Sequence, residues 1–362
     1  MKLIFVSFAF SFIFLTSCIK EVVHEKEQAK RTIIVYMAAD NDLSDDAYAD
    51  IYEMQNVIQE KDINLVVFLD PADDIPHILE IGYVGSRRVK NYPELNSASA
   101  SQMEHVLKDV ITMYPAISYG LILWSHGTSW LPAGNMLKSF GNDNGRQMDI
   151  TDLAAALPVR FDFILLDACL MGSVEVVYEL RHKTDFILAS SAEIIYSGFP
   201  YEQIIPELFK DELDLKKVAA SYFNYYDSFK DLYRSATISL IDTRELNKLA
   251  MVTSQIINDR VFDFSAFDRV WVQRLDVYEA LYTFDFLDFI EKAFPDADND
   301  LLRKQLDNVV IYKAHTPEFI GIFTIESYCG LSCYIPDVTH GLKNFYQQLD
   351  WCKDSGFCQL FW

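Results

Sequence analysis

The stretch Tyr119–Gly127 (YGLILWSHG) decides the fold, because a near-continuous hydrophobic run leads directly into Ser-His-Gly. A second run, Phe161–Leu166 (FDFILL), leads into Asp167-Ala168-Cys169 in the same way. Runs of this length are typical of strands that are buried on both faces of a sheet. Three more runs share the pattern: Thr32–Ala38 (TIIVYMA), Ile63–Leu69 (INLVVFL) and Phe186–Ser190 (FILAS).

Segments with helical periodicity separate these runs. They are Ser44–Gln59, Ser99–Met113 and Ser173–Arg181. Alternation of strands and helices predicts an α/β fold, with a mostly parallel sheet that carries helices on both faces. We therefore expect an α/β core over residues 31–209.

From about Lys210 the pattern loosens, and we expect residues 210–362 to form a C-terminal α/β extension that packs on the core. Its expected helices are Leu213–Phe229 and Arg244–Asn258, and its expected strands are Asn308–Lys313, Phe319–Glu326 and Leu331–Ile335.

Composition narrows the class of protein. Of the 362 residues, 51% are hydrophobic, which excludes a disordered or low-complexity chain. The 31 basic and 53 acidic residues give a formal charge of −22, which disfavours nucleic acid as a partner and favours cationic proteins or peptides. We expect a monomer.

The N-terminus predicts export. Residues 1–17 combine one early lysine with a short apolar run, as in a secretory signal peptide. Leu15-Thr16-Ser17-Cys18 resembles a bacterial lipobox, which implies a lipid on Cys18 and a place at the outer membrane or cell surface. Residues 18–30 are charged and are predicted to form a tether. The alternative, a membrane-spanning anchor, is disfavoured because the apolar run is too short.

Four cysteines near the C-terminus allow three disulfide pairings, among which the sequence does not choose. They are Cys329, Cys333, Cys352 and Cys358. Cys329 and Cys333 lie in an apolar stretch, so reduced and buried thiols are the alternative for these two.

His126 and Cys169 follow two of the expected parallel strands, so both should emerge at one edge of the sheet, where α/β proteins bind ligands. Neighbouring strands lie about 5 Å apart, which suits a thiol nucleophile and its proton-transfer partner. A helix expected just after Cys169 should lower the thiol pKa, and the amides of Gly127 and Cys169 are candidates for an oxyanion site. The alternative is a structural histidine and an inert core thiol.

The order of these motifs resembles the clostripain family of cysteine peptidases, within the caspase–gingipain–legumain group. The matching blocks are Val35–Leu43 (VYMAADNDL), Trp124–Gly127 (WSHG), Leu165–Val176 (LLDACLMGSVEV), Ala189–Glu193 (ASSAE) and Gly330–Pro336 (GLSCYIP). The resemblance implies a caspase-like fold, a Cys169–His126 dyad and cleavage after Arg or Lys. The competing hypothesis is a non-catalytic acidic surface lipoprotein that binds cationic peptides or proteins.

Two acidic residues are candidates for a pocket that selects the basic side chain. Asp167 lies two residues before Cys169, so strand alternation points both side chains the same way. The alternative for Asp167 is a helix cap. Glu193 follows the next strand and could join the pocket, or it is an exposed loop acid.

The segment Thr128–Met148 between the two catalytic strands is polar and contains Lys138 and Arg146. Loops of this length are usually functional or easily cleaved. The family resemblance implies maturation by internal cleavage here, so we predict self-cleavage after Lys138, with Arg146 as second choice. The alternative is an inert loop.

No cofactor is predicted to be required. Asp40 and Asp42 belong to an acidic cluster that would suit calcium, because oxygen ligands suit that ion. The favoured alternative is a helix that begins near Asp42 with acids in its first turn.

Overall fold

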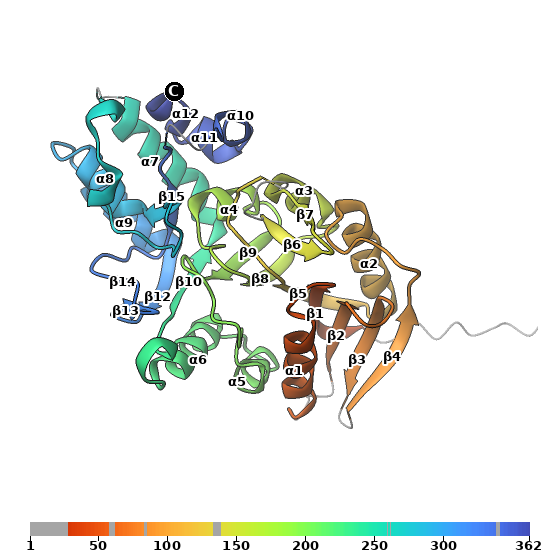
Figure 1. The fold of residues 1–362 in the computed structure, drawn as a ribbon. Helices are drawn as coiled ribbons and strands as arrows, with labels where there is room; N and C mark the ends of the chain where they lie inside the picture. Colours follow the sequence, from red (N-terminus) through yellow and green to blue (C-terminus); the bar gives the residue numbers. More distant parts are fainter. Residues whose placement is uncertain are drawn as a thin grey trace, which may run out of the picture.

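The computed structural model describes residues 28–57, 62–82, 85–132, 139–258, 260, 262–337 and 341–362. At its centre lies a nine-stranded sheet with the order β12-β10-β9-β8-β5-β1-β2-β3-β4 (Figure 1). The strands are β1 (Ala29–Ala39), β2 (Ile63–Pro71), β3 (His77–Gly82), β4 (Gly85–Asn91), β5 (Ala116–Trp124), β8 (Phe161–Asp167), β9 (Thr184–Ala189), β10 (Thr237–Asp242) and β12 (Val310–His315).

The five middle strands β2, β1, β5, β8 and β9 are parallel, which confirms the predicted mostly parallel sheet. All five hydrophobic runs form these strands. The outer strands β3, β4, β10 and β12 pair antiparallel, and the sequence pattern did not predict β3, β4 or β10. β4 (GSRRVKN) lies at the edge and is largely exposed, so it lacks the hydrophobic run that marks a buried strand.

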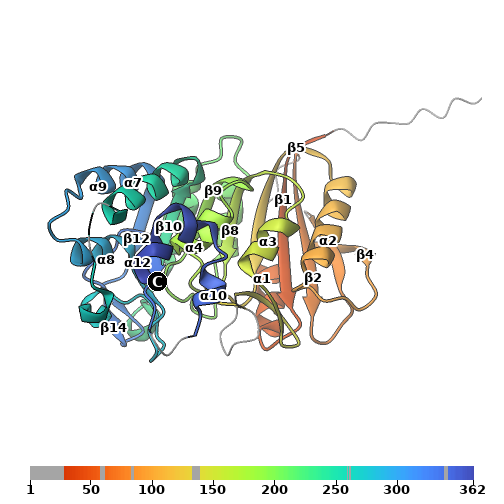
Figure 2. The ribbon, with the colours of Figure 1, turned by 90° about the horizontal axis from the view of Figure 1, so that it is seen from above.

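Helices cover both faces of the sheet, as predicted (Figures 1 and 2). One face carries α1 (Ser44–Gln55), α5 (Tyr201–Leu208) and α6 (Leu215–Asp227); the other carries α2 (Ala100–Met113), α3 (Ile150–Ala156), α4 (Val174–Glu179) and α7 (Leu246–Asn258). Along β1, Ile33, Val35 and Met37 pack on the face that carries α1, α5 and α6. Ile34 and Tyr36 pack on the opposite face. This alternation explains why the strand is hydrophobic at every position.

The C-terminal half extends the same sheet through β10 and β12 and adds further elements. These are β11 (Thr283–Asp285), α8 (Phe286–Ala293), α9 (Asp300–Val309), β13 (Glu318–Phe319), β14 (Phe323–Thr324), β15 (Ser332–Tyr334), α10 (Lys343–Tyr346), α11 (Asp350–Asp354) and α12 (Phe357–Phe361). The predicted strand Phe319–Glu326 is wrong, because only the short hairpin β13–β14 forms there. The sequence pattern missed α8 and α9.

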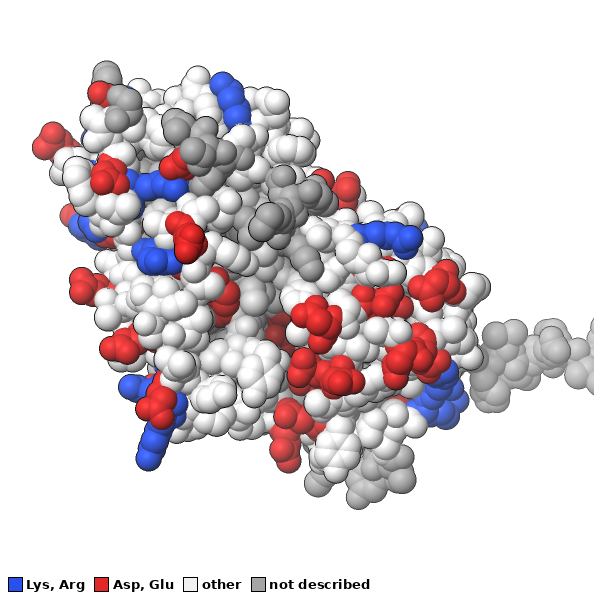
Figure 3. All heavy atoms as spheres, in the orientation of Figure 1, with Lys and Arg blue, Asp and Glu red and all other residues white. Residues whose placement is uncertain are grey.

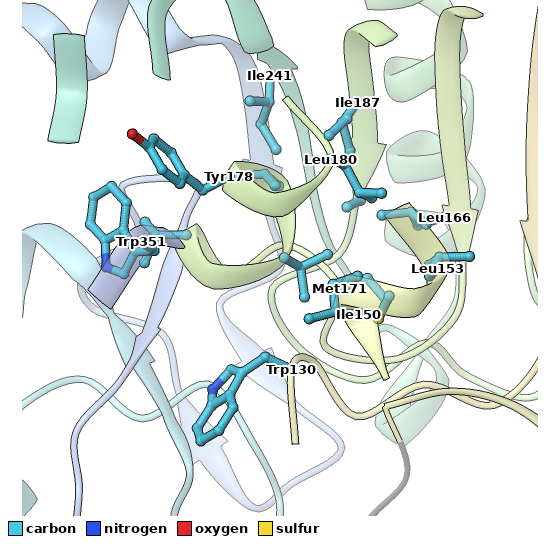
Figure 4. Packing of buried hydrophobic residues seen from close by; sticks show 14 of the residues in the cluster. Trp130, Ile150, Leu153, Leu166, Met171, Tyr178, Leu180, Ile187, Ile241 and Trp351 are labelled. Carbon is cyan, nitrogen blue, oxygen red and sulfur yellow. The ribbon is translucent and has the colours of Figure 1, made fainter. Parts of the chain in front are cut away.

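The last helices pack against α4, the helix that follows Cys169. Figure 4 shows Tyr178 of α4 beside Trp351, and their ring centroids lie 5.4 Å apart. Tyr178 also donates a hydrogen bond to Asp354 at 2.8 Å. The C-terminal extension therefore supports the chain that leaves the end of β8.

The cysteine pattern is resolved among the described residues. Cys352 and Cys358 form a disulfide, whereas Cys329 and Cys333 are free and buried, which matches the reduced alternative. The predicted signal peptide, Cys18 and most of the tether lie outside the described residues. The end of the predicted tether is wrong, because Ala29 and Lys30 already belong to β1. Among the helices described, none is long and apolar enough to cross a membrane.

Candidate active site

His126 and Cys169 follow neighbouring parallel strands, as predicted. Trp124 at the end of β5 pairs in register with Asp167 at the end of β8, so each candidate lies two residues beyond the same pair. The two segments touch at Gly127, where an added Cβ would lie 2.8 Å from the Cys169 carbonyl oxygen. A residue without a side chain is therefore needed for this close approach.

The chain bends sharply after Cys169. Leu170 has a φ of 64°, although it is not glycine and is fully buried. Its amide donates to Ala192 O at 2.9 Å, and the Gly172 amide donates to Ser190 O at 2.7 Å. Backbone strain of this kind costs about 1–3 kcal/mol and gathers at functional sites, where neighbouring structure enforces it.

Cys169 is partly buried, and its thiol is not activated. Its sulfur accepts a hydrogen bond from the Ile194 amide at 3.3 Å and lies 3.6 Å from the Ile194 carbonyl oxygen. Burial raises the pKa of the thiol to about 12, and the negative charges of Glu193 and Asp167 add to the shift. The prediction of a lowered thiol pKa is therefore wrong for this conformation.

The helix that was expected to lower that pKa forms close to its predicted start. α4 begins at Val174, one residue after the predicted start and five residues after Cys169. Ser173 caps it by accepting a hydrogen bond from the Val176 amide at 3.3 Å. Ser173 thus provides a hydrogen-bond acceptor at the N-terminus of α4, and burial remains the main influence on the pKa of the thiol.

Glu193 lies beside Cys169 and is not an exposed loop acid, so that alternative is wrong. Its Oε1 accepts a hydrogen bond from the Val277 amide at 3.0 Å, while Oε2 is buried without a hydrogen-bond partner among the described residues. Burial raises the pKa of Glu193 to about 7, and Asp276 adds to the shift.

The segment 275–282 contacts this part of the site through the hydrogen bond from Val277 to Glu193, and the sequence pattern did not predict this contact. Asp276 is fully buried and accepts hydrogen bonds from the amides of Tyr278, Tyr282 and Thr283. Burial raises the pKa of Tyr278, and the charges of Glu193 and Cys169 raise it further, so this phenol lies within electrostatic reach of the thiol. Tyr278 lies more than 100 residues after Cys169 in the sequence, so local sequence pattern does not indicate this proximity.

Asp167 is buried below the site. Its Oδ2 accepts hydrogen bonds from the Phe199 amide at 3.1 Å and from the Tyr201 hydroxyl at 2.8 Å. The helix-cap alternative is wrong, because Ser173 caps α4. Burial raises the pKa of Asp167 to about 6.

A second buried acid, Asp50 of α1, lies within electrostatic reach of Asp167, and the sequence analysis did not single it out. Asp50 accepts a hydrogen bond from the Trp124 indole at 2.7 Å. Burial raises the pKa of Asp50 to about 9, with Asp167 as the next cause. Asp50 and Asp167 therefore lie near the ends of β5 and β8, where ionisation of one carboxyl group disfavours ionisation of the other.

His126 contacts Asp42, which the sequence analysis had considered as a calcium ligand. The His126 Nε2 lies 2.9 Å from the Asp42 Oδ1. Among the residues that the structure describes, no group of three or more His, Cys, Asp or Glu side chains could hold a metal ion. α1 begins at Ser44, with Asp45 and Asp46 in its first turn, as the helix-start alternative requires. The acids after Asp42 therefore have a structural explanation in the first turn of α1, and calcium binding stays a hypothesis.

Part of the segment after His126 forms regular secondary structure. It contains the hairpin β6 (Phe140–Asp143) and β7 (Arg146–Met148), in which Asp143 pairs with Arg146. The Arg146 side chain is exposed, and its Nη1 lies 3.9 Å from the Asp143 Oδ1. Lys138, the first choice for self-cleavage, lies outside the described residues.

The chain as a whole is acidic, with a formal charge of −22. Acidic side chains predominate over basic ones on the face of the molecule that Figure 3 shows. Such a surface attracts cationic peptides from a distance.

Comparison with known proteins agrees with this arrangement. A model of the clostripain family matches residues 35–362. The chain belongs to the clostripain family of cysteine peptidases. The match includes the ends of β5 and β8, so His126 and Cys169 both lie within the family region.

Clostripain-family relatives share both sequence and fold with this chain. The clostripain of Hathewaya histolytica is 26% identical over 229 residues, which cover 51% of this chain and only 43% of that relative. An inactive zymogen C11 protease from Parabacteroides distasonis has a TM-score of 0.81 at 30% identity and covers 91% of this chain and 99% of its own. A secreted C11 cysteine protease from Bacteroides thetaiotaomicron, in complex with an irreversible peptide inhibitor, has a TM-score of 0.80 at 27% identity with the same coverage. Nothing in these comparisons supports the non-catalytic lipoprotein hypothesis.

Proposed function

We propose that this clostripain-family protein is a cysteine endopeptidase that cleaves after Arg or Lys. The observation that carries the proposal is the close backbone approach of Gly127 to Cys169, just beyond the ends of two adjacent parallel strands. Family membership over residues 35–362 and the peptide inhibitor bound by a structural relative support it.

In the proposed reaction, the Cys169 sulfur attacks the carbonyl carbon of the scissile bond, and the amides of Gly127 and Cys169 bind the oxyanion. The C–N bond then breaks, and the proton from the thiol reaches the leaving amine through His126. Water hydrolyses the resulting thioester and releases the acid. No cofactor takes part in these steps.

Asp167 is the proposed acid of the specificity pocket. It is 5% exposed, and an added Cβ at Gly198 would lie 3.0 Å from its Oδ2, so the carboxylate is tightly packed. A guanidinium or ammonium group would favour the ionised form of Asp167 and offset the burial that now raises its pKa. Glu193 is the proposed second acid, because its Oε2 has no hydrogen-bond partner among the described residues.

Internal cleavage is the proposed route to activity. A thiol pKa of about 12 leaves little thiolate at neutral pH, which suits a precursor. We favour Lys138 over Arg146, because the backbone of Arg146 is paired in a hairpin and a peptidase binds unpaired, extended chain. A relative that is described as an inactive zymogen is consistent with this route.

A fluorogenic peptide panel tests the proposal. Peptides that differ only in Lys, Arg, Leu or Asp before the reporter are incubated with the wild-type protein and with Cys169→Ala, His126→Ala and Asp167→Asn. We expect turnover of Lys and Arg peptides only, none with Cys169→Ala, and an Asp167→Asn variant with at least about 10-fold weaker preference for basic residues. Equal turnover of Leu or Asp peptides by the wild type would remove the pocket assignment.

Two parts of the proposal have separate tests. Membrane anchoring through Cys18 requires the wild-type protein to enter the membrane fraction and Cys18→Ser to stay unprocessed or be released. Activity that survives exhaustive chelation would support a reaction without calcium, whereas loss that added calcium restores would favour the calcium alternative.

A further inference from the structure

Asp42 and His126 form a pair that a two-residue mechanism does not use. The Asp42 Oδ1 lies 2.9 Å from the His126 Nε2, and the side chains are 77% and 28% exposed. A carboxylate only accepts hydrogen bonds, so Nε2 must carry the hydrogen in this contact. The contact thereby leaves Nδ1 as the nitrogen that exchanges a proton with the reacting groups.

The loop that presents Asp42 is fixed on both sides. Asn41 accepts a hydrogen bond from the Leu43 amide at 2.9 Å, so the chain turns tightly around Asp42. The Asn41 amide group donates to Ala38 O at 3.0 Å and to Asn142 O at 2.6 Å. Asp42 therefore stands on a short turn that is anchored to β1 and β6.

The His126 side of the pair is anchored to the same elements. The Ser125 hydroxyl donates to Ala38 O at 2.6 Å and accepts from the Asn142 amide at 3.2 Å. The Gly141 amide donates to His126 O at 3.0 Å. Because the Asp42 and His126 backbones share the Ala38 and Asn142 anchors, their relative position is set before substrate arrives.

We propose that Asp42 is a positioning residue that holds the His126 imidazole through Nε2, so that Nδ1 delivers the proton to the leaving amine. The proposal rests on the proposed peptidase function. During acylation the S–C bond forms, the C–N bond breaks, and His126 passes the thiol proton to nitrogen while the Asp42 carboxylate stabilises the transient imidazolium. Asp42 itself neither gains nor loses a proton.

The proposal predicts a kinetic effect without a large loss of stability. Exposed ion pairs contribute only about 0–1 kcal/mol to the free energy of unfolding, so Asp42→Ala should fold normally. The effect should depend on the leaving group, because a poor leaving amine needs a proton and a good leaving phenolate does not.

The experiment compares kcat/KM for a peptide amide and for the p-nitrophenyl ester of the same acyl group, using the full chain after any self-processing. For Asp42→Ala we expect a loss of about 10–100-fold with the amide, mainly in kcat, and less than about 3-fold with the ester. Added formate should restore part of the amide activity, because the site is exposed enough to admit a small carboxylate. Chloride at equal ionic strength should not.

Asp45→Ala is the matched control, because it removes the same charge three residues away without touching His126. Equal losses with amide and ester, or no response to formate, would overturn the positioning role and leave the peptidase intact. A wild-type protein that cleaves neither substrate, or a Cys169→Ala variant that cleaves both, would instead refute the proposed function.

Discussion

The ends of β5 and β8 lie side by side, yet they prepare their residues in opposite ways. At the end of β5, His126 is partly exposed and already has a carboxylate on Nε2. At the end of β8, the Cys169 sulfur is held against Ile194, and burial raises its pKa to about 12. The comparison teaches that the residue proposed for proton transfer already has its carboxylate partner, whereas the proposed nucleophile is held in its protonated form.

The largest expected effect concerns that nucleophile. In a Lys138→Ala chain, which we expect to remain uncleaved, Cys169 should react with iodoacetamide about 10³-fold more slowly at pH 7 than in the unfolded chain, because only the thiolate reacts. Peptide mapping by mass spectrometry separates Cys169 from Cys329 and Cys333. Equal rates in folded and unfolded chains would show that the thiol is not suppressed, and the contrast between the strand ends would disappear.

A smaller effect tests the contact between the strand ends. Gly127→Ala places a Cβ 2.8 Å from Cys169 O and 2.9 Å from the Ala168 Cβ, so one segment must move. A displacement of about 1 Å at a reacting centre lowers kcat/KM by about 10²-fold. Gly82→Ala is the control, because its nearest contact would be 3.8 Å away. If both variants keep full activity, the close approach of the two segments has no role in catalysis.

The smallest expected effect concerns the acids below both strand ends. The folded pKa of Asp50, about 9, lies above its ordinary value, so its contribution to stability is complete at low pH and is lost as pH rises toward 9. We therefore compare Asp50→Asn with its parent, both in a Cys169→Ala background. As pH rises from 6 to 8, the free energy of unfolding of the variant should increase by about 1–2 kcal/mol relative to that of the parent. Urea unfolding at both pH values measures this difference. Asp45→Asn, an exposed control, should show no such trend.

The sequence predicted the features that leave a local pattern, namely the buried middle strands and the residues that follow them. The middle strands are hydrophobic at every position because helices cover both faces, and that signal placed His126 and Cys169 at one edge. β4 and β10 were missed, since β4 is a polar edge strand and β10 is a short run within a less regular region.

The electrostatic state of the site was beyond the sequence, because it depends on contacts between distant segments. Glu193 accepts a hydrogen bond from Val277, 84 residues later, and His126 meets Asp42, 84 residues earlier. The proximity of Cys169 to a helix in the sequence suggested a lowered pKa. Burial of the sulfur and the charges of Glu193 and Asp167 raise it instead, although the hydrogen bond from the Ile194 amide acts in the opposite direction.

Covalent labelling of the nucleophile tests the central claim most directly. The purified, self-processed protein is incubated with an irreversible peptide ketone that carries Lys at its reactive end, and the labelled residue is identified by mass spectrometry. The account predicts one label per chain on Cys169, lost in Cys169→Ala and slowed in the uncleaved Lys138→Ala chain. A processed protein that remains unlabelled, or that carries its label on another residue, would contradict Cys169 as the nucleophile of this clostripain-family protein.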